Sequence, residues 1–510
     1  MICPHCESEI EEHATVCGVC NKPLGEETET VQTPGAYKRK TPVWLWIFGV
    51  IILITAFVGV FFLAPGFIQS PEKPLLFTVI SNNPQGMAIF STDPTLKNPQ
   101  QIVLNDSGLM LPFCGYYGNE KSFLSPDRQN IAMATGSEMT RMTLFSVKER
   151  SKTILSEIAI PPYGLPVQGF SSKGKFFGFT TLESDDPKAS VQIFDKKGKA
   201  VREIPDAIFG GFSPDERQIV VLRYDPSEVT VTGLDIVEIA SGKRKPLVDM
   251  DYGGDMEASL FTHPFFSPDG KDIFFVNYDQ LFRFSITGGE PDKVYTFKGG
   301  SGLAFISPKQ DKLVLVDMQD DSASTAVRKA VLADILFYDL KTKAVSPLAE
   351  RIIYNMASKD LPIICEQAFL ISDDQKQIAH NGLSEETGQL VISAIDGSRK
   401  DAFTEALEFS LEFTPDNRAL VYLARPTPFG ADILYGDLYI SNLDGKSPIF
   451  LDKDVWSFTM INGGKEILYI KVDLPTSQTF TSEIYKINAD GTGKVVMMES
   501  KDGIYTFLKD

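Results

Sequence analysis

The chain has 510 residues, 43% of them apolar and 23% charged, so it is long enough for several domains and lacks the composition of a disordered protein. Its 67 Asp and Glu outnumber its 49 Lys and Arg, and the net charge of -18 disfavours nucleic acid as a partner. Four of the six cysteines lie within the first twenty residues, which excludes a disulfide scaffold spread over the chain.

The first element in chain order is a cluster of thiols. Its ligand candidates are Cys3, Cys6, Cys17 and Cys20, with the spacing C-x2-C-x10-C-x2-C. Two C-x-x-C turns direct four thiolates at one centre, and a closed tetrahedral S4 shell suits one structural Zn²⁺. The alternatives are two local disulfides or a redox pair, but no βαβ pattern follows that would support a redox fold.

The apolar positions around these cysteines, Ile10, Ala14 and Leu24, match a known pattern. Residues 1–25 resemble the short zinc ribbons at the N-termini of many bacterial membrane proteins. Some zinc ribbons bind nucleic acid, but residues 1–30 hold seven glutamates against one basic residue, Lys22. A phosphate-binding surface needs the opposite sign, so we expect a structural ribbon that could contact a cytosolic protein.

A membrane-length apolar run follows. Residues 43–63 contain no charge and would span about 31 Å as a helix, the thickness of a bilayer core. A signal peptide would be shorter and would not follow forty hydrophilic residues, and the other alternative is a buried core helix. The sequence therefore predicts a single transmembrane helix in contact with membrane lipid.

The flanks of this helix predict its orientation. Lys38, Arg39 and Lys40 end the predicted flexible linker 26–42, whereas the linker 64–74 carries one Lys and one Glu. The positive-inside rule places the N-terminus in the cytoplasm, where cysteines also stay reduced. Residues 75–510 are then expected to be extracytoplasmic, in a protein of the cell membrane.

A recurring phrase organises residues 75–510. An apolar strand ends at Phe, a turn such as Ser-Pro-Asp-Gly follows, and a second, nearly all-apolar strand comes next. Two more strands then complete a unit of about 45 residues, which is typical of a β-propeller blade. Copies begin at Phe123, Phe170, Phe212, Phe266, Phe305, Leu370, Phe413 and, in degenerate form, Phe458.

The phrase resembles the PD40 (WD40-like) repeats of TolB-like propellers, and the resemblance implies an all-β propeller fold. Three strands precede the first phrase and GIYTFLKD follows the last blade, so we expect these four strands to form one blade that closes the ring. The literal count is nine blades. Because nine-bladed rings are rare, the prediction is a propeller of about eight four-stranded blades, within a range of seven to nine.

The sequence offers little support for catalysis. Only His263 and His380 follow the apolar run, in different blades, and no G-x-S-x-G nucleophile elbow occurs. The carboxylates of Asp249, Asp251 and Asp255 depart from the spacing of a calcium loop. We therefore expect no enzyme activity and no cofactor other than zinc.

Loop lengths indicate where a ligand would bind. Connections between strands one and two and between three and four are short. The other connections are long and emerge on one face, where functional residues concentrate, and they include residues 104–121, 249–263, 317–334, 350–367 and 424–437. Neutral length variation is the alternative. Tyr116, Tyr117, Tyr252, Arg351 and Tyr354 lie on segments read as long loops, and Tyr and Arg often anchor interfaces.

These features predict a non-catalytic binding or scaffold module. Its partner would be a protein, a glycan or another envelope ligand bound by the propeller. One alternative is a transmembrane sensor that couples this binding to a cytosolic partner. A second alternative is a hydrolase or other enzyme on the top face of the propeller.

Overall fold

A computed structural model describes the part of the chain that was predicted to form the propeller. The described residues are 75–82, 85–93, 95–96, 99–106, 124–135, 141–157, 168–182, 188–228, 230–249, 264–277, 279–324, 329–357, 369–384, 387–396, 398, 400–402, 408–429, 433–445, 448–473, 481–500 and 503–507. The predicted ribbon, linkers and transmembrane helix, residues 1–74, lie outside them. None of the described segments forms an apolar helix of the length that a membrane span requires.

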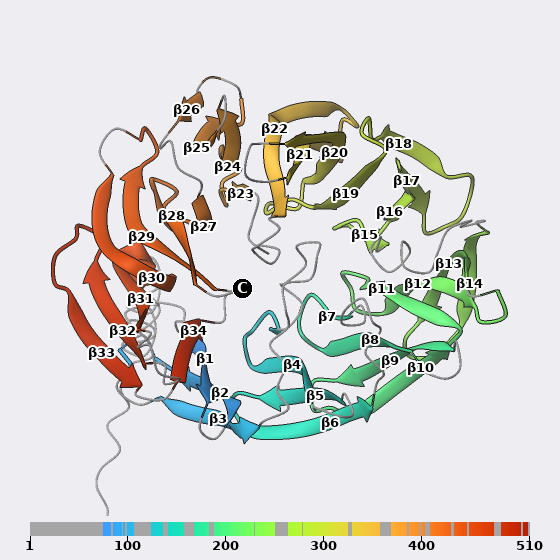
Figure 1. Ribbon diagram of the computed structural model, residues 1–510. Coiled ribbons are helices and arrows are strands. Elements are labelled where there is room, and N and C mark those ends of the chain that lie inside the picture. Colours follow the sequence, from blue (N-terminus) through green and yellow to red (C-terminus); the bar gives the residue numbers. More distant parts are fainter. Residues whose placement is uncertain are drawn as a thin grey trace, which may run out of the picture. The chain divides into compact units, whose positions relative to one another are not determined.

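The described residues form an all-β structure of small antiparallel sheets, as the repeat predicted (Figure 1). Blade 1 has the strand order β3-β2-β1-β34, and blade 2 consists of β4, β5 and β6 with Leu124 as an isolated bridge to Ile131. The strands of these two blades are β1 (Leu75–Asn82), β2 (Gln85–Thr92), β3 (Gln100–Asp106), β34 (Gly503–Phe507), β4 (Asn130–Thr135), β5 (Arg141–Ser146) and β6 (Ser151–Glu157).

Blades 3, 4 and 5 are separate four-stranded sheets. Blade 3 comprises β7 (Gln168–Phe170), β8 (Phe176–Leu182), β9 (Ala189–Asp195) and β10 (Ala200–Pro205). Blade 4 comprises β11 (Ala207–Phe212), β12 (Gln218–Asp225), β13 (Thr230–Glu238) and β14 (Arg244–Asp249). Blade 5 comprises β15 (Phe265–Phe266), β16 (Asp272–Asn277), β17 (Gln280–Ser285) and β18 (Asp292–Thr296).

Blades 6 and 7 form one eight-stranded sheet because a single pair, Ile352 with Gly382, links β22 to β24. Blade 6 comprises β19 (Ser301–Ile306), β20 (Lys312–Ser324), β21 (Lys329–Asp339) and β22 (Val345–Ala357). Blade 7 comprises β23 (Phe369–Ile371), β24 (Gln377–Ser384), β25 (Thr387–Ala394) and β26 (Lys400–Ala402).

Blades 8 and 9 share one long strand, β30. Its first half pairs with β29, and its second half pairs with β31. The strands are β27 (Glu408–Phe413), β28 (Ala419–Phe429), β29 (Ile433–Asn442), β30 (Ile449–Ile461), β31 (Glu466–Asp473), β32 (Thr481–Asn488) and β33 (Val495–Ser500), with the 3-10 turn η2 (Asn462–Gly464) between β30 and β31.

The described residues therefore contain nine blade-like units, which lies at the upper end of the predicted range of seven to nine and one above the preferred number of eight. The eight phrases each mark one blade, and the closing blade is the ninth. The closure itself was predicted correctly, because β34 pairs with β1 in antiparallel register from Phe77 with Phe507 to Ser81 with Gly503. Figure 1 shows the red β34 beside the blue β1 in this shared sheet.

The second strand of a blade is buried on both faces because its side chains alternate between two neighbours. In β12, Ile219 and Val221 pack against blade 3, while Val220 and Leu222 pack against blade 5. All four side chains are fully buried. Such strands carry no polar face, which explains the continuous apolar runs in the sequence.

Nine hydrophobic clusters join each blade to the next one. The last of them packs Leu75 and Phe77 of blade 1 against Ile461 and Leu468 of blade 9, so the series returns to its start. Residues 72–510 form one compact unit, which contains all nine clusters and the closing strand. The unit therefore has its own hydrophobic core and its own closing strand, which are the features of a domain that can fold independently.

Candidate functional site

The two edges of the blades differ, and the first edge carries the repeated turns. In seven turns a Ser or Thr directly follows the first strand, and its side-chain oxygen accepts a hydrogen bond from the backbone N–H five residues later, at 2.9–3.2 Å. These hydroxyl-bearing residues are buried and are Ser125, Ser171, Ser213, Ser267, Ser307, Ser372 and Thr414.

An aspartate completes most of these turns. In the turn at Ser213, the hydroxyl donates to Asp215 at 2.6 Å, and the same carboxylate oxygen accepts the N–H of Arg217 at 3.1 Å. The hydrogen bond from the hydroxyl holds the pKa of Asp215 below its usual value, and the equivalent bonds do the same for Asp269 and Asp416. The carboxylates of these aspartates therefore take part in the hydrogen bonds of the turn itself.

In several turns the fourth residue contacts the preceding blade. Glu216, at φ 60°, accepts the Ser171 hydroxyl at 2.5 Å and the N–H of Lys173 at 2.9 Å. Gln375 donates to Asp311 of the preceding turn at 3.0 Å. Gly464 lies so close to Pro415 that an added Cβ would stand 2.7 Å from the ring. The turns are therefore packed side by side, and we call this edge the turn edge.

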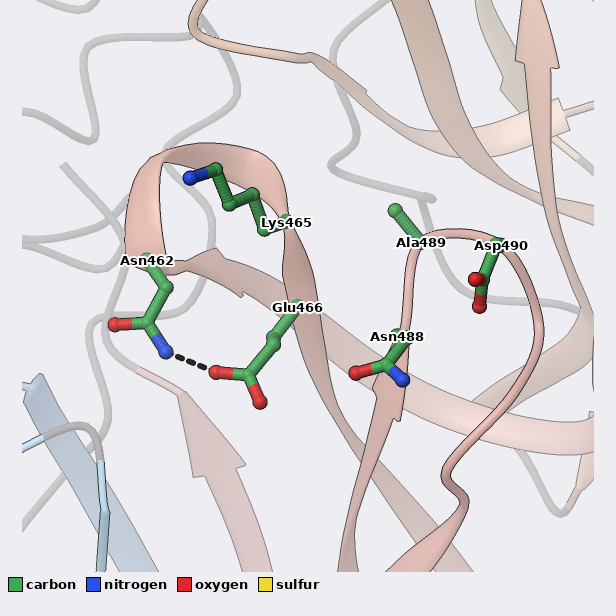
Figure 2. Close-up of a pocket in the computed structure, with 6 residues that line it drawn as sticks. All are labelled: Asn462, Lys465, Glu466, Asn488, Ala489 and Asp490. Atoms are coloured by element: carbon green, nitrogen blue, oxygen red, sulfur yellow. Dashed lines mark hydrogen bonds between the residues drawn. The ribbon is translucent and has the colours of Figure 1, made fainter.

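One shallow depression opens on the turn edge, at blade 9. It has a volume of about 540 Å³ and is lined by Asn462, Lys465, Glu466, Asn488, Ala489 and Asp490 (Figure 2). In this turn Ile461 stands where the other turns have Ser or Thr, and Asn-Gly-Gly follows it, so the buried hydroxyl is missing.

Four of the lining side chains already bond within the protein, and among them Asn488 donates to Thr492 at 3.0 Å and Asp490 accepts the N–H of Thr492 at 2.9 Å. Figure 2 shows the Asn462 amide bonded to Glu466, which also accepts Lys486 at 2.6 Å. The bond from Lys486 is the largest cause that lowers the pKa of Glu466. The six lining residues include no Ser, Thr, Cys or His, so the depression offers no nucleophile with a base.

The opposite edge, which we call the hairpin edge, carries extended strands. The prediction of long loops at residues 317–334 and 424–437 was wrong, since β20 and β21 continue as paired strands to Ser324 with Lys329 and β28 pairs with β29 as far as Phe429 with Ile433. β20, the second strand of blade 6, has 13 residues, against six to eight in most second strands. Five extra residues project roughly 16 Å beyond the blade.

Arg351 and Tyr354 were predicted on a loop, and the structure instead places both in β22. The reason is that β21 is long enough to pair with the segment as far as Lys329 with Ala357. Arg351 sits at a bulge with φ 49°, its N–H donates to Asp334 at 2.8 Å, and its side chain is exposed. Bulges redirect side chains where a ladder changes course.

The other sequence-predicted site residues lie outside the described residues. They are the candidate zinc ligands Cys3, Cys6, Cys17 and Cys20 and the aromatic residues Tyr116, Tyr117 and Tyr252. Among the residues that the structure does describe, no group of three His, Cys, Asp or Glu side chains gathers as a metal site. Asp249, from the weak calcium pattern, instead pairs with Arg223 at 2.6 Å.

Buried charges that the sequence reasoning missed are satisfied by neighbours. Burial by itself would raise the pKa of Asp452, but hydrogen bonds from Lys494 at 2.5 Å and Tyr469 at 2.8 Å outweigh it and lower that pKa. Burial and the bond to Asp452 in turn raise the pKa of Tyr469. Asp235 is held in the same way by Arg223 and Arg244. These groups join strands to one another.

The comparisons with known proteins find distant structural likeness only. No family model and no curated protein matches the chain. TolB from Acinetobacter baumannii is 17% identical with a TM-score of 0.29, over 64% of this chain and 79% of that one. The β-propeller domain of the Trilobed protease from Pyrococcus furiosus is 13% identical with a TM-score of 0.33, over 65% and 98%.

An enzyme also appears among these structures. Porphyromonas gingivalis dipeptidyl peptidase 4 is 11% identical with a TM-score of 0.45, over 76% of this chain and 60% of that one. The structures found at these levels of similarity include both enzymes and TolB, so the similarity does not distinguish a catalytic from a non-catalytic role.

Proposed function

We propose that the chain is a membrane-anchored, extracytoplasmic β-propeller that acts as a non-catalytic binding module through its hairpin edge. The predicted helix at 43–63 anchors it, and the predicted zinc ribbon at 1–25 lies in the cytoplasm. The ligand is a protein, a glycan or another envelope component.

The difference between the two edges carries this proposal. On the turn edge, the connections are short, and the hydroxyl and carboxylate groups of the turns hydrogen-bond within and between the turns themselves. The hairpin edge instead extends blade 6 and blade 8 by paired strands. Elements that project from a rigid scaffold are where binding residues concentrate.

The bulge at Arg351 supports the same edge. Bulges re-aim side chains and are over-represented at sheet edges and next to functional sites. Here the Asp334 carboxylate holds the Arg351 backbone, and the guanidinium side chain is left exposed at the base of the projecting hairpin. Arginine is enriched among the residues that anchor interfaces.

A shortened hairpin tests the proposal. Replacing residues 319–332 by Asn-Gly joins Met318 to Ala333, which pair directly across the strands, through the turn that two-residue hairpins favour. The full-length chain is then crosslinked in intact cells. We expect the adducts of the natural chain to disappear in the shortened chain. The shortened chain should still unfold cooperatively, with a melting temperature lowered by about a few degrees because the buried Leu332 is lost.

The matched control changes the turn edge of the same blade. Lys341→Ala with Lys343→Ala alters two exposed side chains at the opposite end of blade 6 and should leave the adducts in place. An unchanged adduct pattern in the folded, shortened chain would contradict the proposal. So would loss of adducts in the control alone.

A further inference from the structure

A group of basic residues stands out on the turn edge of blades 2 and 3. Four turns at 125–129, 147–150, 171–175 and 195–199 carry eight Lys or Arg against three Asp or Glu, a net charge of +5 in a chain whose net charge is -18. We call these four turns the basic patch. Its exposed cations are Lys148, Arg150, Lys173, Lys175, Lys196, Lys197 and Lys199.

The four turns of the basic patch lie against one another. Within blade 2, the N–H of Val147 donates to Gln129 at 2.8 Å, and within blade 3 the N–H of Lys196 donates to Lys175 at 3.1 Å. Between the blades, Cβ atoms added at Gly174 and Gly198 would stand 3.4 Å from Pro126 and 2.7 Å from Thr153. The cations therefore form one continuous surface.

The carboxylates near this surface offset only part of its charge. Glu216 of blade 4 accepts the Ser171 hydroxyl and the N–H of Lys173, and so places one negative charge beside the +5 of the four turns. Asp195 accepts the N–H groups of Lys197 and Lys199 at 2.8 and 3.0 Å, and these bonds use backbone rather than side-chain donors. Asp127 is likewise occupied by the Ser125 hydroxyl at 2.6 Å. Within the described residues, no carboxylate forms an ion pair with Lys196, Lys197 or Lys199.

The turn edge is also the edge at which the propeller chain begins. Leu75, the first residue of β1, packs with Leu96 and with Ile461, which directly precedes the η2 turn. The linker 64–74 would therefore join the turn edge to the predicted membrane helix. Even fully extended, its 11 residues reach at most about 40 Å.

We propose that the basic patch is a docking surface for anionic phospholipid headgroups of the membrane that holds the chain. The proposal rests on the anchor in the proposed function, which limits how far the turn edge can stand from the bilayer. At about 0.1 M salt, screening acts over about 10 Å, so the local +5 outweighs the distant acidic residues. Docking in this way would point the hairpin edge away from the bilayer.

Vesicle flotation with residues 72–510, the self-contained propeller unit, tests the proposal without the anchor. The unit should float with vesicles of phosphatidylcholine and phosphatidylglycerol and not with phosphatidylcholine alone. Each cation near an anionic surface strengthens partitioning roughly fivefold. The variant Lys196→Glu, Lys197→Glu, Lys199→Glu should therefore weaken partitioning by at least on the order of 100-fold.

The control reverses the charge of three exposed lysines in the turns of blade 6, where Asp311 and Asp339 nearly balance the local positive charge. Lys309→Glu, Lys341→Glu and Lys343→Glu change the net charge equally and should weaken partitioning only a few-fold. Equal losses in the two variants, or equal flotation with both vesicle types, would overturn the proposal. Binding to soluble polyphosphate without binding to vesicles would overturn it too.

This experiment separates the inference from the proposed function. Residues 72–510 carrying the shortened hairpin should still float with anionic vesicles. If the shortened chain loses its adducts but still binds vesicles, both the binding role of the hairpin edge and the lipid docking of the basic patch are supported. If it keeps its adducts and still binds vesicles, only the binding role of the hairpin edge is rejected.

Discussion

The contact between Glu216 and the preceding turn predicts a measurable cost of substitution. Glu216 is 7% exposed, and its carboxylate accepts one hydroxyl and one backbone N–H from blade 3. Hydrogen bonds to a charged group contribute about 1.5–3 kcal/mol each, and water can replace part of that. We expect Glu216→Ala to lower the free energy of unfolding by about 3 kcal/mol.

Two further variants separate the hydrogen bonds from the backbone. Glu216 has φ 60°, a conformation that costs a non-glycine residue about 1 kcal/mol. Glu216→Gly loses the same bonds but relieves this strain, so it should be about 1 kcal/mol more stable than Glu216→Ala. Glu216→Gln keeps an acceptor oxygen and should fall between Glu216→Gly and the natural chain.

Urea unfolding of residues 72–510, followed by tyrosine fluorescence and circular dichroism, measures these differences. For a unit of this size, 1 kcal/mol corresponds to about 1 °C in melting temperature, so denaturant midpoints are more informative. The reasoning is refuted if Glu216→Ala is as stable as the natural chain, or if Glu216→Gly is no more stable than Glu216→Ala.

Three other predictions follow from single residues. Arg351→Gly should raise the free energy of unfolding by about 1 kcal/mol in urea titration, because it relieves the positive φ and keeps the N–H bond to Asp334, and a lower value would contradict the bulge geometry. The pKa of Asp452 lies below 3.8 in the folded chain, so its stabilisation is present above about pH 4 and is lost as the pH falls through the folded value. Asp452→Asn should therefore flatten the fall in stability between about pH 5 and pH 3, and an unchanged slope would count against this linkage. The isolated ribbon peptide should bind one Zn²⁺, measured by metal titration, and Cys17→Ser should abolish it because a thiolate ligand is lost, whereas metal-free disulfides in the peptide from cytosolic extract would reject the site.

The local fold of each blade was readable from sequence because one phrase encodes it. The Phe that ends the first strand, the Pro and Asp of the turn and the apolar second strand recur together, and seven of the eight turns have the predicted hairpin form. The buried hydroxyl was missed, although Ser or Thr stands first in those seven turns. Its role depends on an N–H five residues later, which the strand pairing alone brings within reach.

The blade number was less accessible. Each blade contacts only its two neighbours, so the repeated phrase contains no information on how many blades close the series. The literal count from the sequence was nine, with blade 9 marked by the degenerate phrase at Phe458, and eight was preferred because nine-bladed rings are rare. In the structure, β30 serves as the fourth strand of blade 8 and the first strand of blade 9.

The hairpin edge was misread for a different physical reason. Small and polar residues fill QDDSAS at 319–324, so no apolar period marks the strand. The segment pairs because β21 and β22 continue beside it and supply the backbone partners. The position of Arg351 at a bulge depends on the Asp334 side chain, a contact between strands that spacing along the sequence does not specify.

Site-specific photo-crosslinking within blade 6 tests the central claim most directly. A photoreactive residue is placed at position 351, at the base of the hairpin edge, or at position 341, on the turn edge of the same blade, in the full-length chain in intact cells. Both positions are exposed, so the two probes differ only in the edge they report. The account predicts specific protein or glycan adducts from position 351 and none from position 341. Adducts from position 341 alone, or from neither position, would contradict it.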